Sequence, residues 1–230
     1  MRGRLIVVEG TDCSGKETQT NLLKEKLEKD GINVKKYSFP MYDTPTGKIV
    51  GGPYLGKSYI CDGWFKEGAT NVDYKVASLL FTADRLYNIN IINEDLNKGN
   101  DVILDRYVYS NMAHQGGKLL DKEKRDEVYS FLEELEFNLC KLPVPDVKIF
   151  LHMPTSYASI LKKNREEKPD EHEQNEEYLS NAEKAYIEVA SRYDFSTIEC
   201  VKDDEIRSIN DINNELYEIV KNKKIKSLKI

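Results

Sequence analysis

The chain has 230 residues, which is enough for one large domain with a substantial apolar core but short for two full domains. Its 34 basic and 40 acidic residues leave a formal charge of −6, so no positive surplus indicates a nucleic-acid or membrane-surface partner. The longest aliphatic runs, such as Leu5 to Val8, are far shorter than the ~20 residues of a membrane-spanning helix.

Two further features bear on the compartment. The apolar stretch near the first residue ends at Glu9, too early for the core of a secretory signal, so we expect a cytoplasmic location. The four cysteines are scattered along the chain without a CxxC pair, which predicts free thiols rather than disulfides or a zinc site.

Apolar runs and helical spacing alternate along the chain. Buried strands are predicted at 5–8, 34–39, 102–104 and 147–151, with a weaker fifth at 197–201. Apolar residues at helical spacing predict one helix before Gly31 and another through Val76, Leu79, Leu80, Ala83 and Leu86. Later helices are predicted near 121–139, 155–167, 173–192 and 205–221.

This alternation predicts an α/β fold with a doubly wound parallel sheet, helices on both faces, and ligands at the carboxyl ends of the strands. We expect one domain over residues 1–230. The glycine-rich stretch 47–68 is predicted to be loop and short helix around a site. The charged stretch 162–177 is predicted to form a flap, and the lysine-rich end at 221–230 to be solvated or frayed.

The first strand runs directly into a GxxxxGK pattern that opens the first helix. Glycines let backbone N–H groups converge on phosphate oxygens, the helix N-terminus adds positive potential, and Lys16 supplies a charge. The pattern therefore predicts a nucleoside triphosphate site. Its expected residues are Gly10, Thr11, Asp12, Cys13, Ser14, Gly15, Lys16, Glu17 and Thr18.

Glu17 occupies the position where a serine or threonine normally ligates Mg²⁺. Two interpretations are open. Its carboxylate is a hard oxygen ligand for Mg²⁺, or Ser14 and Glu17 form a capping box at the start of the helix. Replacement of Glu17 by threonine separates them through metal dependence and rate.

Five motifs occur in order along the chain: Glu9-Gly10-Thr11-Asp12, Gly15-Lys16, Phe39-Pro40, Phe81-x-x-x-Arg85 and Asp105-Arg106-Tyr107. Together they resemble the thymidylate kinases of the P-loop nucleoside monophosphate kinase group, from residue 5 to about residue 200. The resemblance implies a P-loop NTPase-type fold with a five-stranded parallel sheet and a flap. It also implies transfer of the ATP γ-phosphoryl group to dTMP, with Mg²⁺, by a homodimer.

Two alternatives to this function stay open. One is a kinase for another nucleotide or nucleoside, and the other is a P-loop nucleotide-binding regulator without turnover. A preference for thymine or uracil acceptors over cytosine acceptors would distinguish a thymidylate kinase from a kinase for another nucleotide. The retained Lys16, Asp105 and Arg106 disfavour a regulator without turnover.

Arg106 follows Asp105 at the end of a buried strand, so both side chains should reach the cleft. There the arginine can clamp phosphates while the carboxylate holds Mg²⁺ directly or through water. Asp12 lies in the phosphate loop and, in similar kinases, contacts the nucleotide sugar or the metal. The alternatives are a structural Asp–Arg pair and a turn-forming aspartate.

Phe81 and Arg85 lie one helical turn apart and share a face. The ring can stack on a base while the guanidinium donates to a base carbonyl, which favours thymine over cytosine. The alternative places Phe81 in the core and Arg85 at the surface.

The segment after Asp105-Arg106 resembles the part of the family that lies beside base and sugar, and His114 stands there where a tyrosine is common. That replacement leaves deoxyribose selectivity open. The expected acceptor-binding residues are Asp12, Phe39, Pro40, Tyr42, Phe81, Arg85, Arg106, Asn111, His114 and Gln115.

Two departures concern cations. Related enzymes often carry an arginine near Met41 and Tyr42 for the dTMP phosphate; here the Tyr42 hydroxyl can contact it, and Lys48 is a speculative substitute. Cys13 replaces an arginine that reaches the γ-phosphate in one branch of the family. Basic flap residues then become candidates, with Arg165 first and Glu173 as an acidic flap residue near sugar and metal.

Overall fold

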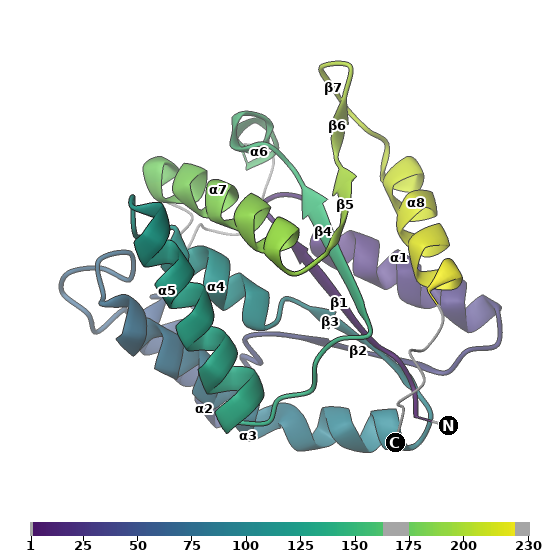
Figure 1. The fold of residues 1–230 in the computed structure, drawn as a ribbon, viewed down its shortest axis with the longest axis horizontal. Coiled ribbons are helices and arrows are strands. Elements are labelled where there is room, and N and C mark those ends of the chain that lie inside the picture. Colours follow the sequence, from purple (N-terminus) through teal and green to yellow (C-terminus); the bar gives the residue numbers. More distant parts are fainter. Residues whose placement is uncertain (1, 163–174, 224–230) are drawn as a thin grey trace.

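A computed structural model describes residues 2–162 and 175–223. Its centre is a five-stranded parallel sheet in the order β2-β3-β1-β4-β5 (Figure 1). The strands are β1 (Leu5–Gly10), β2 (Val34–Ser38), β3 (Asp101–Asp105), β4 (Val147–His152) and β5 (Ser196–Glu199). The predicted α/β class and the parallel sheet are therefore confirmed, with strand ends shifted by a few residues.

Helices connect the strands and cover both faces of the sheet (Figure 1). They are α1 (Lys16–Lys29), α2 (Pro45–Ile49), α3 (Tyr74–Asn97), α4 (Val108–Gly116), α5 (Lys122–Leu132), α6 (Thr155–Lys162), α7 (Glu176–Arg192) and α8 (Ile209–Asn222). Two π-helical turns, η1 (Val50–Tyr54) and η2 (Glu133–Leu139), continue α2 and α5.

Alternate residues of β1 feed separate cores on the two faces. Leu5 and Val7 pack in the cluster that includes residues of α3, α4 and α5. Ile6 and Val8 pack in the cluster formed with α1 and α8. All six β1 residues are buried because helices cover both faces, which explains the unbroken apolar run from Leu5 to Val8 in the sequence.

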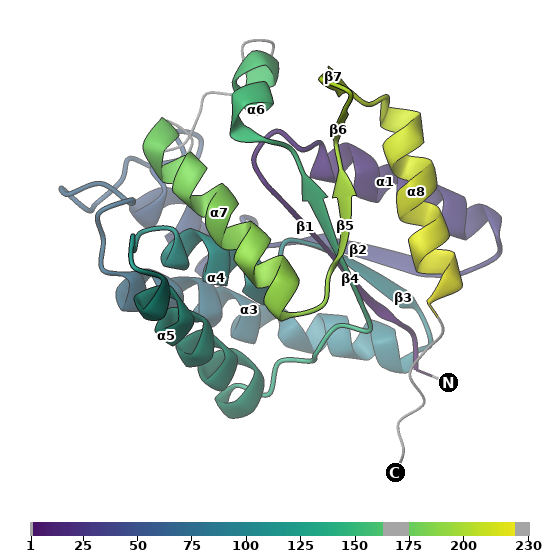
Figure 2. The same ribbon diagram turned by 45° about the horizontal axis from the view of Figure 1, so that its top comes forward.

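Three predicted helices have different bounds in the structure. The helix expected over 121–139 divides into α5 and η2. The helix expected from 205 begins at Ile209, with the Ser208 hydroxyl accepting from the amide of Asp211, because 201–206 form a hairpin of β6 (Val201–Lys202) and β7 (Glu205–Ile206). This hairpin extends beyond β5 (Figure 2). The helix expected over 155–167 is seen as α6 up to Lys162.

Parts of two predicted segments lie outside the described residues. For the flap predicted at 162–177, the described part consists of Lys162 at the end of α6 and 175–177 at the start of α7. For the basic end at 221–230, Lys221 and Asn222 belong to α8. Within the described ranges, no helix is long and apolar enough to cross a membrane.

The glycine-rich stretch 47–68 forms α2, η1 and a long loop, as predicted. Val50 and Tyr54 of η1 pack with Val72 and Ala77 in a small core of their own. This core lies against the start of α3, on the side of the sheet where β2 and β3 end. The stretch 47–68 thus closes a cleft at the carboxyl ends of β1, β2 and β3.

Candidate active site

The loop Gly10–Lys16 joins β1 to α1 and has the backbone of an anion-binding turn. Cys13 and Gly15 have φ values of 57° and 72°, in the left-handed region. A Cβ on Gly10 would lie 2.5 Å from the Ser14 hydroxyl oxygen and 2.8 Å from the Leu151 carbonyl oxygen, so only glycine fits there.

The capping-box interpretation of Ser14 and Glu17 is wrong. Gly15 is the N-cap of α1, and no side chain caps the helix. The amide groups of the first turn therefore stay available to an anion. Glu17 is exposed in that turn and lines the cavity in front of the loop, together with Thr18, Asp105 and Lys16.

Lys16 folds back over the loop. Its Nζ atom donates to the carbonyl oxygens of Gly10 and Thr11, both at 3.0 Å. Burial, together with the charge of Arg106, lowers the pKa of Lys16 to about 8, while Asp12, Asp105 and Glu9 act against this shift. A bound phosphate would stabilise the ammonium form further.

Thr11 was predicted to bind nucleotide, and its hydroxyl is engaged elsewhere. It donates to the Met153 carbonyl oxygen at 2.7 Å and accepts from the Met153 amide at 3.0 Å. The side chain thus ties the phosphate loop to the end of β4, which leaves its backbone as the part that faces a ligand.

Arg106 is the centre of the cleft. Its φ of 67° turns the chain sharply at the end of β3 and directs the guanidinium toward the phosphate loop. The guanidinium donates to Asp12 Oδ1 and to the Tyr186 hydroxyl, both at 2.8 Å. Burial opposes the charge, but Tyr186 and Asp12 hold the pKa of Arg106 above its usual value. Asp12 and Arg106 were each predicted as site residues, and the structure joins them in one ion pair that the sequence did not predict.

Glu9 belongs to one of the sequence motifs but was not predicted as a site residue. Its Oε1 accepts from the amides of Tyr107 at 2.8 Å and Ser110 at 3.1 Å, and its Oε2 accepts from the Ser110 hydroxyl. Burial raises the pKa of Glu9 to about 7. Glu9 therefore holds the N-terminus of α4 against the end of β1, where the phosphate loop begins. The sequence signal was an acid directly after four buried apolar residues.

A second cavity, of about 190 Å³, opens beside the first between α3, α4 and the end of β2. Residues predicted for acceptor binding line it: Asp12, Phe39, Pro40, Tyr42, Phe81, Arg85, Arg106, Asn111 and His114. Phe81 and Arg85 face it from consecutive turns of α3, as their spacing predicted. We name it the acceptor cavity.

Arg85 differs from its prediction in one respect. Nε and Nη2 form a bidentate ion pair with the carboxylate of Glu136 on η2, the second bond measuring 2.6 Å, and both residues are buried. The interpretation of Arg85 as a surface charge is therefore wrong. Arg85 therefore lines the cavity while two of its nitrogens donate to Glu136. Nothing in the sequence distinguished Glu136 from the neighbouring acids.

Asn111 is held by acceptors on one side. Its Nδ2 donates to Glu136 Oε1 at 3.1 Å and to the Ser78 carbonyl oxygen at 3.3 Å, which fixes the orientation of the amide. Its Oδ1 is buried and has no hydrogen-bond partner among the described residues. Asn111, a residue of the acceptor-cavity lining, therefore carries a buried acceptor atom that lacks a donor within the described residues.

Asp84 was also missed. Asp84 lies on α3, and its carboxylate accepts hydrogen bonds from the Met41 amide and from the Thr46 hydroxyl, both at 2.9 Å. The buried carboxylate thus holds the turn after β2, which carries Pro40 and Tyr42 into the cavity.

His114 and Gln115 separate. His114 lines the acceptor cavity, with Nε2 3.4 Å from Arg106 Nη1 and Nδ1 3.1 Å from the Tyr178 hydroxyl. Gln115 is fully buried, lines none of the cavities described here, and its amide has no hydrogen-bond partner within 2–162 and 175–223. The prediction that Gln115 contacts the acceptor is not supported, because the next helical position points away from the cleft.

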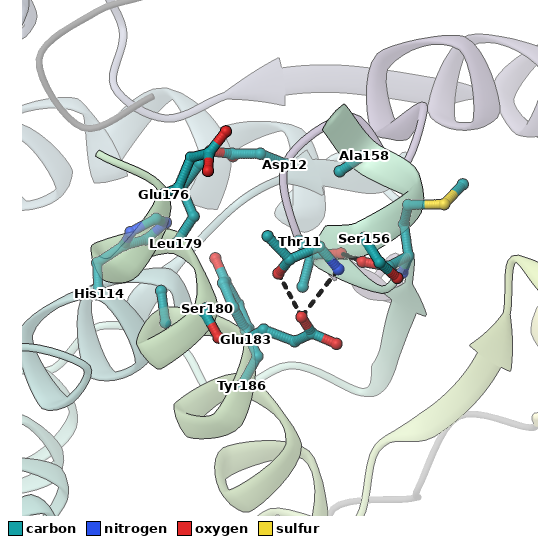
Figure 3. Close-up of a pocket in the computed structure, with 13 residues that line it drawn as sticks. Thr11, Asp12, His114, Ser156, Ala158, Glu176, Leu179, Ser180, Glu183 and Tyr186 are labelled. Carbon is teal, nitrogen blue, oxygen red and sulfur yellow. Dashed lines mark hydrogen bonds between the residues drawn. The ribbon is translucent and has the colours of Figure 1, made fainter. Parts of the chain in front are cut away.

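A third cavity, of about 450 Å³, lies between α6 and α7 on the far side of Asp12 and His114 (Figure 3). Glu183 of α7 lines this cavity. Its carboxylate accepts hydrogen bonds from the Thr155 amide at 2.9 Å and from the Thr155 hydroxyl, which fixes the start of α6. Glu183 also contacts His152 Nε2 at 2.9 Å, and this contact raises the pKa of His152. No sequence motif had indicated this cluster.

The predicted cations differ in whether they line these cavities. Lys48 is exposed on α2 and lines none of these cavities, so it does not substitute for the missing arginine. Lys57, which was not predicted, lines both the phosphate-loop and the acceptor cavities. Arg165 and Glu173 lie outside the described residues.

Comparisons with known proteins agree with this arrangement. The profile of the thymidylate kinase family matches residues 8–212. A thymidylate kinase of Schizosaccharomyces pombe is 32 % identical over 226 residues, covering 96 % of this chain and 93 % of the relative. A probable thymidylate kinase of Methanocaldococcus jannaschii is 30 % identical over 219 residues, covering 94 % and 95 %.

A solved structure shows the same fold. The thymidylate kinase of Candida albicans superposes with a TM-score of 0.72 at 25 % identity, covering 96 % of this chain and 92 % of that one. The phosphate loop, the Asp12–Arg106 pair and the acceptor cavity lie within the matched region. The chain therefore belongs to the thymidylate kinase family.

Proposed function

We propose that the protein transfers the γ-phosphoryl group of ATP to dTMP, giving ADP and dTDP. The observation that carries the proposal is that the phosphate-loop cavity and the acceptor cavity share Asp12 and Arg106. A donor bound at the loop and an acceptor bound beside α3 would therefore present their phosphates to one another across the same arginine.

This chemistry needs positioning and charge neutralisation more than a covalent nucleophile. An acceptor phosphate oxygen forms a bond to the γ-phosphorus while the bond to the β-phosphate oxygen breaks and ADP leaves. Lys16 neutralises the donor phosphates, and Arg106 bridges donor and acceptor. Asp12 keeps the guanidinium in place through its 2.8 Å hydrogen bond.

The acceptor cavity suits a thymine ring. Phe81 offers an aromatic face, and Asn111 offers a buried Oδ1 acceptor that needs a donor. The N3–H of thymine or uracil is a donor, whereas N3 of cytosine is an acceptor and would leave two acceptors facing each other. The remaining N–H groups of Arg85 suit a base carbonyl. Selection against cytosine therefore follows from the amide orientation that Glu136 and Ser78 impose.

Mg²⁺ fits the acids present. No group of three or more His, Cys, Asp or Glu residues forms a ready-made metal cage in the described part of the chain. Mg²⁺ binds through one or two carboxylates together with phosphate oxygens and water, so it does not need such a cage. Asp105 would hold it, with Glu17 as the second candidate, since both line the phosphate-loop cavity. Bound there, the ion would neutralise charge on the transferring phosphates. Arg165 stays a prediction for the flap.

We also propose a homodimer formed through α3. Val76, Leu79, Leu86 and Ile91 form an apolar stripe on its outer face and are 44–53 % exposed. A second copy packing the same helix against this stripe would bury it in an isologous contact. Light scattering should give the mass of a dimer, and Leu79→Glu should give a monomer.

The four cysteines are free thiols, which suits the reducing cytoplasm in which we expect the enzyme to act.

The test is release of ADP from Mg-ATP with dTMP, dUMP, the ribonucleotide of thymine, dCMP, dGMP and thymidine as acceptors. We expect turnover with dTMP, weaker turnover with dUMP and none with dCMP. Turnover of a different acceptor would move the substrate within the same chemistry, and ATP binding without transfer would favour the regulator.

A further inference from the structure

The phosphate-loop and acceptor cavities meet at a junction where an acceptor phosphate has to lie. Six residues line both cavities: Asp12, Phe39, Pro40, Tyr42, Lys57 and Arg106. In this shared lining the cations are Arg106 and Lys57. The junction therefore holds a lysine that belongs to none of the sequence motifs.

Arg106 by itself is poorly matched to the charge of the acceptor. A nucleoside monophosphate carries close to two negative charges at neutral pH. The guanidinium of Arg106 already donates to the Asp12 carboxylate, which offsets part of its own charge. Since Lys16 faces the donor phosphates, a second cation is needed on the acceptor side to balance the dianion.

The backbone around Lys57 is built to bring it to the cleft. Its amide donates to the Gly51 carbonyl oxygen at 2.8 Å, and its own carbonyl oxygen accepts from Ile60 at 2.8 Å. A Cβ on Gly51 would lie 2.7 Å from a ring carbon of Tyr42, so glycine is what lets this turn pack so closely. The turn thus stands directly over Tyr42, whose ring faces the cleft.

Two rings then direct the ammonium group. Lys57 Nζ lies 5.2 Å from the ring centroid of Tyr42 and 5.9 Å from that of Tyr59. The rings themselves meet edge to face at 6.4 Å. Cation–π attraction of this kind holds the ammonium group of a lysine beside the two rings. Tyr42 and Tyr59 also line the phosphate-loop cavity.

We propose that Lys57 binds the phosphate of the acceptor nucleotide and acts with Arg106 as the second cation of that subsite. The proposal rests on the proposed function and names the group that recognises the substrate's phosphate. It assigns the long loop after η1 a specific task, since that loop delivers the charge. Lys48 takes no part, because it is exposed on α2 outside the cavity lining.

The experiment compares two ligands that differ only by the phosphate. Binding of dTMP and of thymidine is measured by calorimetry for wild type, Lys57→Met, Lys57→Arg and the matched control Lys48→Met. We expect Lys57→Met to weaken dTMP binding by about 10- to 100-fold, as for one lost charge-assisted hydrogen bond, and thymidine binding by less than about twofold. Lys57→Arg should recover most of the preference for dTMP, and Lys48→Met should match wild type.

Kinetics supply an independent readout. Lys57→Met should raise the KM for dTMP while leaving the KM for ATP near that of wild type. Equal losses of dTMP and thymidine binding would mean that Lys57 only supports the fold of the loop, and unchanged dTMP binding would also overturn the proposal. If the wild-type enzyme turns over no nucleotide, the proposed function fails, but the binding comparison still decides the role of Lys57.

Discussion

The donor and acceptor halves of the site meet at Asp12 and Arg106 but are built differently. The donor half is the single continuous loop Gly10–Lys16, whose geometry comes from glycine conformation and a helix N-terminus. The acceptor half gathers residues from the end of β2, from the loop after η1, and from α3 and α4. Its geometry depends on buried polar contacts, chiefly Arg85 with Glu136.

This contrast has a mechanical consequence. Loss of the donor-side Lys16 should damage catalysis and leave the fold intact, because burial of its ammonium group opposes folding. Loss of an acceptor residue should damage recognition and stability together, because the same ion pair shapes the cavity and joins α3 to η2. Substitutions in the two halves can therefore break or confirm this difference.

The largest effect is expected on the acceptor side. Glu136→Leu leaves the guanidinium of Arg85 buried without its partner, which should lower the free energy of unfolding by about 3–5 kcal/mol. Asp126→Ala, which removes a partly exposed pair with Arg192, is the control and should cost less than about 1 kcal/mol. Urea unfolding measures both; similar losses in the two variants would contradict a structural role for the buried pair.

On the donor side we expect the reverse pattern for Lys16→Met. Removing a charge that neutralises the transferring phosphates should lower kcat by about 10²- to 10³-fold. The free energy of unfolding should change little, because burial of the ammonium already opposes folding, as its lowered pKa shows. Lys24→Met, at a partly exposed position of α1, is the control. A destabilisation as large as that of Glu136→Leu would erase the distinction between the two halves.

Glu9 links the halves, since it lies on β1 and holds α4. In the unfolded chain its carboxyl loses a proton near pH 4.5, while in the folded protein burial raises its pKa to about 7. The corresponding stabilisation is complete below pH 4.5 and fades as the pH rises to 7. Wild type should therefore lose up to about 3 kcal/mol between pH 4.5 and 8 relative to Glu9→Gln.

Unfolding of the two proteins at a series of pH values measures this difference. Parallel stability profiles would show that Glu9 does not retain its proton in the folded state.

The smallest effect concerns base selection. Asn111→Leu removes the buried Oδ1 acceptor, so the preference for dTMP over dCMP in kcat/KM should fall by about tenfold. Asn97→Leu, at the exposed end of α3, should keep the wild-type ratio. An unchanged ratio in Asn111→Leu would assign base selection to Arg85 alone.

The sequence predicted the donor half of the site better than the acceptor half. The glycines, Lys16 and the helix start are contiguous, so pattern and spacing predicted the loop, and the one local error was the capping box. Phe81 and Arg85 were predicted on one helical face because their spacing is also local. Glu136 was not, because its partner lies 51 positions away and nothing nearby marks it as buried.

The cations show the limit most clearly. Lys48 lies closer in sequence to Tyr42, yet Lys57 reaches the cleft, because the chain turns back over Gly51 and packs on the Tyr42 ring. Similarly, the acid Glu9 appeared in a motif, but its role required α4 to come to rest against β1.

The sequence by itself determined the α/β class, the five strands of the parallel sheet, and the phosphate loop, but not helix α4 or the β6–β7 hairpin. Apolar runs, helical spacing and glycine positions act over a few residues, so each carries its own structural information. The tertiary structure alone decided which charges are buried, which cavity each element lines, and where the acceptor cations lie. Those outcomes depend on pairs far apart in the chain, whose contact exists only once the sheet and its helices have packed.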